Sequence, residues 1–410
     1  MQEADFVEKI RSSGGRVFVV GGYVRDKLMD RPPKDKDYVI SGIQEQEFCV
    51  LFPDAKRVGK SFPVYLEEIN GKFSEIAFAR KEQKAGKGYR GFTTEYDAAI
   101  TIEEDLYRRD STMNSIAWEL PGEILLDPYH GVDAIRAKEI RAVSAHFLED
   151  PVRALRAARQ SAELGFTITD QTFSYMKACK EELSAEPQER LFAELTKALA
   201  SEQPSLFFRN LQAADLLQLC FPEIHALIGK TQPKDFHPEG DAFEHSMQVV
   251  DFVAKRNPKT ETRFAALCHD LGKGRTPADM LPHHYGHEIC GGDVLREWNA
   301  RMTLPKIWME TAEFAISMHM RAPRIGHSGK KVDLLMALYK SKLSTKDFND
   351  IILADHGSLP DYLRYAGEIL PLLLEVSGND APKELRGKKI AEWIRRERIR
   401  KFTEYTYNTQ

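Results

Sequence analysis

The sequence predicts an α/β head, built on a small mixed sheet with helices, followed by a long all-α body. Two observations lead to this fold class. Up to about residue 140, short runs rich in β-branched and aromatic residues alternate with turn signals, as in RVFVVGG, DYVISG and KFSEIAFAR. After residue 141 apolar residues recur almost everywhere at helical spacing.

The composition is that of an ordinary globular protein with a substantial core. The 410 residues are 42% hydrophobic and 29% charged, which is enough for two to four domains. The start, MQEADFVEKIRSSGG, is polar where a secretory signal needs an apolar core, and the chain carries no apolar run of the roughly 18 residues that a membrane helix requires. We therefore expect a cytoplasmic protein. Five scattered cysteines without a C-x-x-C pair predict neither a disulfide framework nor a thiolate zinc site.

The net charge excludes a general attraction to polyanions. The chain has 58 Lys and Arg against 62 Asp and Glu, a formal charge of −4, so any nucleic-acid site must be a local patch. One candidate is the basic stretch RGKKIAEWIRRERIRK, 386–401. A solvated helix face and a surface that follows phosphates explain this stretch equally well.

Two segments between the regular elements stand out. Residues 79–97, ARKEQKAGKGYRGFTTEYD, are rich in Lys, Arg and Gly with few apolar anchors, and predict a mobile basic loop. Residues 227–241 have the Pro, Gly and polar content of a linker. A second helical unit is then expected to begin near Phe243.

Two aspartates in KDKDYVI predict a magnesium site. In a strand, side chains two residues apart share one face, so Asp35 and Asp37 would point the same way. Two carboxylates in that geometry can bridge magnesium ions roughly 3.5–4 Å apart, which clamp the attacking and leaving oxygens of a phosphoryl or nucleotidyl displacement.

The residues before this doublet supply a phosphate-binding turn. Gly21 and Gly22 end one strand and start the helix YVRDKLM, where amide N–H groups can approach a triphosphate. Arg25 offers a guanidinium fork for phosphate oxygens. Each feature is weak alone, but their combination within seventeen residues is much stronger.

A second charged motif, DLYRRDSTMNSIA, lies at 105–117. Its polar side chains can hold phosphate and ribose, although in isolation they would make an ordinary exposed ion-pair cluster. They are Arg108, Arg109, Asp110 and Asn114. Glu75, in the strand SEIAFAR, is a weaker candidate for a third acidic group near the metal.

In order and spacing these motifs resemble those of the class II tRNA nucleotidyltransferases, the CCA-adding enzymes of the DNA polymerase β-like superfamily. DPYHGVDAI (127–135) looks like the third family motif and EDPVRALRAARQSAELGF (149–166) like the fourth. The resemblance covers nearly the whole chain and implies a nucleotidyltransferase head. It implies that Asp35 and Asp37 are catalytic with Mg²⁺, that Gly22 and Arg25 steady the triphosphate, and that Arg109 contacts nucleotide.

The fourth motif offers a way to choose bases without a nucleic-acid template. Cytosine and adenine show an amino donor beside a ring-nitrogen acceptor, whereas uracil and guanine show a carbonyl beside a ring N–H. Asp150 and Arg153, three apart on one predicted helical face, can present the matching acceptor and donor. The resemblance makes these two the amino-acid template and adds Arg156 to the nucleotide site. Glu149 is expected to orient Arg153.

The helical half carries a second set of metal ligands. His245, the adjacent His269 and Asp270, and Asp355 lie in helical contexts, and such ligands suit a divalent transition metal that activates water. The pattern resembles the HD phosphohydrolase superfamily, and the HD-bearing subset of CCA-adding enzymes in particular. The resemblance implies 2′,3′-cyclic phosphodiesterase, 2′-nucleotidase and phosphatase activities, with nickel favouring the last. Further candidates for phosphate binding or a second metal shell are His237, His283, His284, His287 and His319.

We therefore predict an enzyme that adds or repairs the 3′-terminal CCA of tRNA from CTP and ATP and releases pyrophosphate. The expected parts are a head (1–140), a helical neck and body that contacts tRNA (141–230), an HD core (241–342) with Asp355 just beyond it, and a helical basic tail (356–410). The enzyme would act as a monomer or homodimer, away from membranes.

Several alternatives remain. ARKE at 79–82 argues, by resemblance, against an enzyme that adds only the two cytidines, while an A-adding enzyme is harder to exclude. A bacterial poly(A) polymerase shares the head but typically carries no intact HD motif. The protein could also be mainly an HD phosphohydrolase, a carrier of a degenerate HD fold, or a non-catalytic tRNA-binding module.

Overall fold

The computed structural model describes residues 1–33, 35–58, 63–84, 92–95, 97–235 and 237–409. The chain divides into two compact units, which are described separately below. Unit 1 comprises Met1–Glu194 and Leu206–Leu219, and unit 2 comprises Leu195–Ser205 and Cys220–Gln410.

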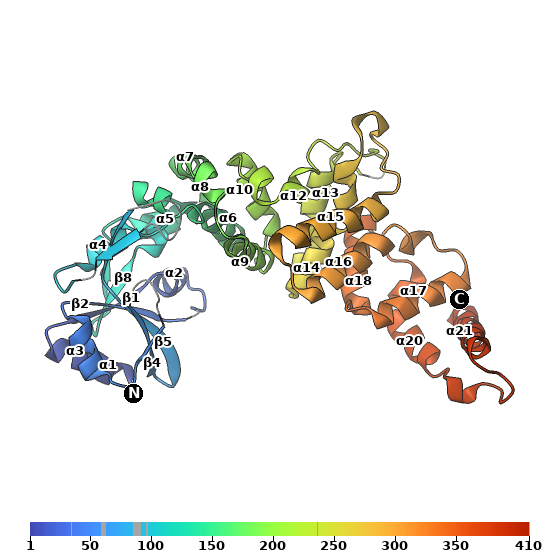
Figure 1. Ribbon diagram of the computed structural model, residues 1–410, viewed down its shortest axis with the longest axis horizontal. Helices are drawn as coiled ribbons and strands as arrows, with labels where there is room; N and C mark the ends of the chain where they lie inside the picture. Colours follow the sequence, from blue (N-terminus) through green and yellow to red (C-terminus); the bar gives the residue numbers. More distant parts are fainter. Residues whose placement is uncertain (34, 59–62, 85–91, 96, 236, 410) are drawn as a thin grey trace. The chain divides into compact units, whose positions relative to one another are not determined.

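Unit 1 is built on a mixed seven-stranded sheet, which confirms the predicted α/β head (Figure 1). The strand order is β3-β4-β5-β2-β1-β8-β9, and β2 and β5 form the parallel pair while the other neighbours are antiparallel. The strands are β1 (Arg16–Val20), β2 (Asp37–Ser41), β3 (Lys56–Arg57), β4 (Val64–Ile69), β5 (Lys72–Phe78), β8 (Ala117–Leu120) and β9 (Ile124–Leu126).

Both faces of this sheet are covered, so β1 is apolar after its exposed first residue, Arg16. Val17 and Val19 lie in one apolar cluster with helices α1 (Glu3–Ser12) and α3 (Glu45–Leu51). Phe18 and Val20 point to the opposite face and join a second cluster with α4 (Ile102–Tyr107). This alternation is the period of two expected for a strand, with apolar residues at both phases because neither face meets water.

The segment predicted as a mobile basic loop contains a second, two-stranded sheet. Strands β6 (Lys81–Lys84) and β7 (Phe92–Glu95) pair antiparallel, so the prediction of a loop is wrong for these residues. The aromatic and β-branched residues Phe92, Thr93 and Thr94 give β7 a β propensity that the Lys and Gly content of the whole segment concealed. Residues 85–91 and 96 of the predicted loop lie outside the described residues.

The rest of unit 1 consists of helices and short bridging elements. Helix α2 (Gly22–Leu28) follows β1, and α6 (Arg153–Leu164) carries the fourth motif. The remaining elements are η1 (Thr112–Asn114), α5 (Gly131–Ala137), β10 (Glu139–Ile140), η2 (Ala145–Glu149), β11 (Thr167–Ile168), α7 (Asp170–Ala178), α8 (Lys180–Leu183) and α10 (Pro204–Ala213). Helices α9 (Gln188–Leu199), α11 (Leu217–Cys220) and, through Pro204 and Ser205, α10 contribute residues to both units.

Unit 2 is helical, as predicted, and its first long helix, α13 (Ala242–Arg256), begins one residue before Phe243. Asp241 caps this helix by accepting hydrogen bonds from the backbone N–H groups of Phe243 and Glu244. The other elements are α12 (Pro222–His225), α14 (Thr260–Cys268), η3 (Leu271–Arg275), η4 (Ala278–Met280), α15 (His287–Met302), α16 (Lys306–Met318), η5 (Ala322–Arg324), α17 (Ser328–Lys340), α18 (Thr345–His356), α19 (Asp361–Arg364), α20 (Ala366–Leu374), η6 (Gly378–Asp380) and α21 (Lys388–Thr409).

The basic stretch 386–401 lies mostly in helix α21, which packs on its own unit. Phe402 is buried in the core shared with α17 and α20. Arg395 donates to both carboxylate oxygens of Asp333 at 2.8 and 2.9 Å, and Arg398 donates to the carbonyl of Leu373 at 2.9 Å. Part of the positive charge of this helix is thus used to hold it in place.

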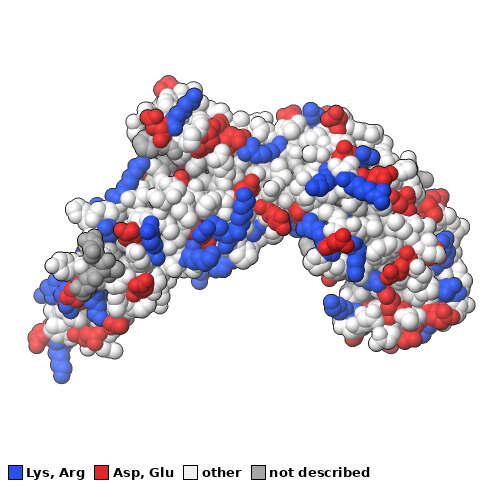
Figure 2. Space-filling model, turned by 180° about the vertical axis from the view of Figure 1, so that it is seen from behind, with Lys and Arg blue, Asp and Glu red and all other residues white. Residues whose placement is uncertain are grey.

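On the face of the molecule that Figure 2 shows, basic and acidic side chains are interspersed. Figure 2 shows Lys and Arg side chains in several separate groups, with Asp and Glu side chains between them. Among the described helices, none combines the length and apolar character needed to cross a bilayer.

Candidate active sites

The turn after β1 brings glycine backbone close to two arginines. Gly21 has a φ of +71°, in the region that favours glycine, and a Cβ built there would lie 3.4 Å from Arg109 Nη1. A Cβ built at Gly22 would lie 3.6 Å from Arg25 Nη2. The two glycines therefore leave open the space between the backbone and two guanidinium groups, which is what an anion-binding turn needs.

Carboxylates gather beside this turn. Burial and the nearby charges of Glu75 and Asp35 raise the pKa of Asp37 to about 6, against the opposing charge of Arg109. Negative charges that raise the pKa of a neighbouring carboxyl in this way favour a cation between the groups. The oxygen-only donor set fits magnesium, and Glu75, the weaker candidate from the sequence, lies near enough to act on Asp37.

The two aspartates do not lie in the same strand, so this part of the prediction is wrong. Strand β2 begins at Asp37, which is paired with Val20, the last residue of β1. Beyond Val20 the chain turns at Gly21, so no ladder partner is left for Asp35. The charge of Asp35 nevertheless acts on Asp37, which shows that the two lie close together without a shared strand.

A buried aspartate holds both arginines of the second motif. Asp105, on α4, is fully buried; its Oδ1 lies 2.5 Å from Arg108 Nη2 and its Oδ2 lies 2.9 Å from Arg109 Nη2. Although burial alone would raise it, the charges of Arg108 and Arg109 hold the pKa of Asp105 well below its usual range. Asp105 was not among the residues predicted from the sequence. Its i,i+3 and i,i+4 spacing to Arg108 and Arg109 indicates ion pairs on one helical face and could have identified it.

A chain of hydrogen bonds joins the first, second and fourth motifs. Arg25 Nη1 donates to Asn114 Oδ1 at 2.9 Å, and Asn114 Nδ2 donates to Asp110 Oδ1 at 3.1 Å. The other oxygen of Asp110 accepts from Arg156 Nε at 2.8 Å. Burial opposes a charge on Asp110, but Arg156 keeps the pKa of this carboxyl well below its usual range. Arg25 and Arg156 are thus connected through two buried polar residues.

The predicted base-reading pair does not share a helical face, and this expectation is wrong. Asp150 has φ −117° and ψ 104°, and α6 begins only at Arg153. Asp150 precedes Pro151, whose ring disfavours helical geometry at the residue before it. Arg190, which the sequence analysis missed, donates to both oxygens of Asp150 at 3.0 and 2.9 Å. Arg153 Nη1 donates to the carbonyl of His146 at 2.6 Å.

In unit 2 the four predicted metal ligands meet. His245 Nε2 lies 3.1 Å from Asp355 Oδ1, and His269 Nε2 lies 3.2 Å from Asp270 Oδ2. The four side chains are 6% exposed or less. Among the described residues, His269 Nε2 and both oxygens of Asp270 are buried polar atoms that make no well-directed hydrogen bond, although Lys273 Nζ lies 2.5 Å from Asp270 Oδ2. Such atoms, aimed at one another, fit a bound cation with nitrogen and oxygen ligands.

Three of the further histidines join this centre, each through a carboxylate. His287 Nε2 and His319 Nε2 each lie 3.3 Å from Asp270 Oδ1. His237 Nδ1 lies 3.1 Å from Glu239 Oε1. Asp270, His287 and His319 therefore form a second group of ligand atoms next to the four predicted ones.

The other two histidines have different partners. His284 Nδ1 lies 2.7 Å from Thr276 Oγ1, and His283 stacks on Tyr285 with ring centroids 5.7 Å apart. Both line the cavity of about 940 Å³ that opens onto the ligands, together with His237, His287 and Lys273. The cavity is large enough for a small phosphoester substrate.

Glu239 orients the first of the predicted metal ligands, His245, and was not predicted from the sequence. Its Oε1 lies 2.7 Å from His245 Nδ1, on the side of the ring opposite to Asp355. Burial opposes the charged ring, but Asp355 and Glu239 together raise the pKa of His245 to about 9. A carboxylate at Nδ1 fixes the ring and leaves Nε2 facing the other ligands.

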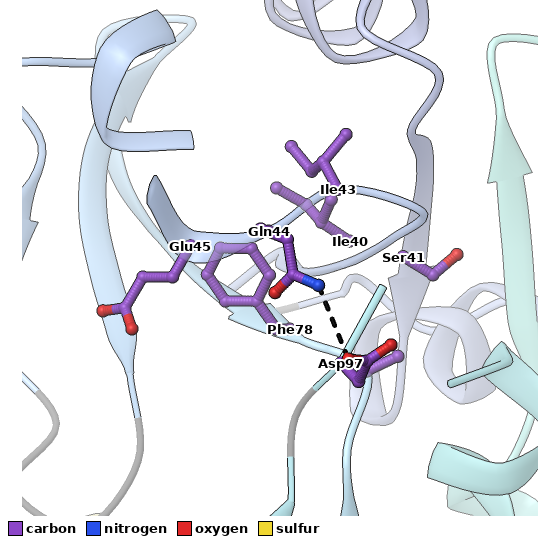
Figure 3. Close-up of a pocket in the computed structure, with 8 residues that line it drawn as sticks. Ile40, Ser41, Ile43, Gln44, Glu45, Phe78 and Asp97 are labelled. Atoms are coloured by element: carbon purple, nitrogen blue, oxygen red, sulfur yellow. Dashed lines mark hydrogen bonds between the residues drawn. The ribbon is translucent and has the colours of Figure 1, made fainter. Parts of the chain in front are cut away.

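A pocket beside the sheet of unit 1 lacks both the histidines and the volume of the cavity in unit 2. It is lined by Ile40, Ile43 and Phe78, among others, and Gln44 Nε2 lies 3.5 Å from Asp97 Oδ2 at its edge (Figure 3). At about 10 Å³ it has room for roughly one water molecule, so it is not a substrate site.

Family comparisons match all three regions of the chain. Residues 17–141 match the Poly A polymerase head domain, residues 165–228 match a family described as "Probable RNA and SrmB- binding site of polymerase A", and residues 242–370 match the HD domain. The third match includes the four predicted HD ligands.

Curated relatives match over most of their length. A "Multifunctional CCA protein" of Methylobacillus flagellatus is 38% identical over 369 residues, which covers 88% of this chain and 88% of the relative. A protein with the same name from Stenotrophomonas maltophilia is 43% identical over 316 residues, covering 76% of this chain and 77% of the relative.

Solved structures share the fold at low sequence identity. The CCA-adding enzyme of Bacillus stearothermophilus in complex with CTP has a TM-score of 0.61 at 22% identity, covering 96% of this chain and 90% of that one. The Thermotoga maritima CCA-adding enzyme complexed with tRNA also has a TM-score of 0.61, at 20% identity, covering 98% and 92%.

Proposed function

This chain belongs to the family of multifunctional CCA proteins, and from that premise we propose how its residues carry out nucleotidyl transfer and phosphoester hydrolysis. It is an enzyme that adds the 3′-terminal CCA to tRNA, and it carries an HD phosphohydrolase domain. As an enzyme of tRNA maturation and repair, it is proposed to work in the cytoplasm.

The observation that carries the transferase proposal is the cluster of Asp35, Asp37 and Glu75 beside the glycine turn and Arg109. Asp35 and Asp37 would hold magnesium, which when bound makes the tRNA 3′-hydroxyl more acidic and offsets charge on the phosphates. Gly22 and Arg25 bind the triphosphate of CTP or ATP. The reaction joins the tRNA 3′-oxygen to the α-phosphate and releases pyrophosphate.

The remaining residues position the nucleotide. Asp105 holds Arg109 and Asp110 holds Arg156, so each guanidinium group is a positive charge in a fixed position. Arg156 ends the chain of hydrogen bonds that starts at Arg25. Asp150 accepts from the amino group that cytosine and adenine share, and Arg153 donates to their ring nitrogen. Arg190 positions Asp150, because it binds both of its carboxylate oxygens.

The test supplies tRNA lacking its last three nucleotides with CTP, ATP or both, and sequences the 3′ ends. Addition of CCA only when both nucleotides are present supports the proposal. Addition of A alone, and only to a CC-ending tRNA, would instead identify an A-adding enzyme. No incorporation under any condition would leave a protein that is mainly an HD phosphohydrolase.

For unit 2 we propose metal-dependent hydrolysis of phosphoesters at His245, His269, Asp270 and Asp355. The supporting observation is the cluster of buried ligand atoms of His245, His269 and Asp270, which lie within 4.8 Å of one another, with Asp355 Oδ1 3.1 Å from His245 Nε2. A transition metal, nickel in the resemblance described above, would activate water when bound there. The cavity of about 940 Å³ has space for the proposed substrates, 2′,3′-cyclic phosphates, 2′-nucleotides and simple phosphomonoesters.

Two variants separate the two activities. Asp35→Ala should abolish nucleotide incorporation and leave hydrolysis of a phosphomonoester in the presence of Ni²⁺ unchanged. Asp270→Ala should do the reverse. If Asp35→Ala removed both activities together, the assignment of two independent sites would be wrong.

A further inference from the structure

A cavity of about 470 Å³ in unit 1 is lined by aromatic rings that the functional proposal does not use. Tyr107, the last residue of α4, is 44% exposed although it is a large aromatic side chain. Its ring centroid lies 5.5 Å from that of Tyr129 and 5.2 Å from that of His146. Tyr129 is in turn fixed, because its hydroxyl donates to the carbonyl of Glu103 at 2.8 Å. The exposed ring of Tyr107 thus packs against the rings of Tyr129 and His146.

The cavity adjoins the nucleotide-positioning residues on one side. Arg108 lines it, and Asp105 binds Arg108 through one oxygen and Arg109 through the other. Arg109 faces Gly21 and acts on Asp37. A single buried carboxylate therefore separates the cavity from the groups assigned to the triphosphate.

The cavity is also connected, through His146, to the residues proposed to read the base. The carbonyl of His146 accepts from Arg153, and His146 Nδ1 lies 2.8 Å from Glu149 Oε1. The aromatic cavity is therefore lined by residues of the second motif and by His146, which in turn contacts Glu149 and Arg153 of the fourth motif.

The charges around the cavity exclude a triphosphate as its occupant. Two basic residues, Lys81 and Arg108, are balanced by Glu103 and Glu104, and Lys81 Nζ lies 2.7 Å from Glu104 Oε1. A polyanion gains little there, whereas a neutral flat ring gains stacking on Tyr107. The occupant is expected to be a base whose phosphates lie elsewhere.

We propose that this cavity stacks the last unpaired base of the RNA acceptor strand, next to the incoming nucleotide. This inference rests on the proposed transferase function. The terminal base changes with each addition, first the base before CCA and then cytosine, so its site must accept different bases. Stacking meets that need because every base has a π face, while reading by hydrogen bonds would favour one base.

The experiment uses the full-length chain and tRNA with 2-aminopurine as its terminal unpaired base. Fluorescence should be quenched on binding to the unaltered protein and to Tyr107→Phe, and much less by Tyr107→Leu or Tyr107→Ala. Tyr107→Leu retains apolar packing without an aromatic face, and intact thermal melting shows that a variant folds. Tyr339→Ala, at a 55% exposed tyrosine of unit 2, is the matched control.

A binding comparison completes the test. An abasic terminal nucleotide should weaken tRNA binding to the unaltered protein by roughly five- to 150-fold, and should have no further effect in Tyr107→Ala. Equal losses in both proteins, or unchanged quenching in Tyr107→Ala, would overturn the inference, as would a rise in KM for CTP with unchanged tRNA binding. Absence of incorporation by the unaltered protein would count against the transferase proposal instead, because quenching and binding need no catalysis.

Discussion

Asp37 shows how one residue in the head can link chemistry to pH. Its raised pKa, about 6, means that the protonated, neutral form persists two pH units above the ordinary range of an aspartate. At the proposed site, protons and magnesium would compete for the same carboxylate, and protonation would be favoured as the pH falls.

We therefore expect nucleotide incorporation to decline below about pH 6, with an apparent magnesium requirement about fourfold higher at pH 5.5 than at pH 7.5. The measurement is incorporation of CTP against pH at two magnesium concentrations. Raising magnesium should move the acid limb to lower pH. If the pH below which incorporation declines were the same at both magnesium concentrations, a group other than Asp37 would limit the reaction.

Glu239 supports a second prediction at the scale of a residue. Its contact with His245 Nδ1 at 2.7 Å orients a metal ligand, so Glu239→Gln should weaken nickel binding by roughly tenfold while the chain stays folded. Isothermal titration of the metal-free protein with Ni²⁺ measures this. Glu310→Gln, on the exposed side of α16 with Lys306 3.8 Å away, is the matched control and should leave the affinity unchanged. Equal affinities in the two variants would contradict the role given to Glu239.

Among the elements, most strands and helices could be predicted because their apolar pattern is regular. The wrong predictions for Asp35 and Asp150 concern segments in which a single Gly or Pro interrupts the strand or helix expected from the sequence. Pro151 takes Asp150 out of helix α6, and the turn at Gly21 leaves Asp35 without a strand partner. Arg190 and Glu239 could not be assigned from the sequence because each acts on a residue far along the chain or in irregular structure, whose position depends on the fold, whereas the role of Asp105 could have been inferred from its spacing to Arg108 and Arg109.

The contact between η3 and α15 makes a further prediction at the scale of elements. A Cβ at Gly272 would collide with the carbonyl oxygen of His287 and lie 2.7 Å from the backbone nitrogen of Gly291. Gly272→Ala should displace α15 and His287 with it, reducing phosphohydrolase activity at least tenfold and the free energy of unfolding by about 1–3 kcal/mol. Incorporation of CTP should be retained.

The control for that change is Gly326→Ala, since a Cβ at Gly326 meets nothing within 4 Å. Metal-dependent hydrolysis and urea denaturation, followed in parallel for the two variants, distinguish displacement of the ligand from general loss of stability. Full hydrolysis by Gly272→Ala would show that the close approach of the two elements does not position His287.

For the whole molecule, the balance of charge sets how tRNA can be bound. With a formal charge of −4 and basic groups dispersed among acidic ones (Figure 2), binding must rely on local clusters of Lys and Arg. The affinity for tRNA should nevertheless fall steeply between 50 and 200 mM salt, because each phosphate contact releases counterions. Filter binding across a salt series measures the slope, and an affinity independent of salt would rule out phosphate contacts as its source.

Asp105 also limits how this part of the sequence can change during evolution. Because one carboxylate holds both Arg108 at the aromatic cavity and Arg109 at the proposed nucleotide site, the two proposed binding sites, for the RNA end and for the incoming nucleotide, depend on the same side chain. A mutation at this position would damage both at once, so evolution could not adjust primer affinity here without also changing nucleotide affinity.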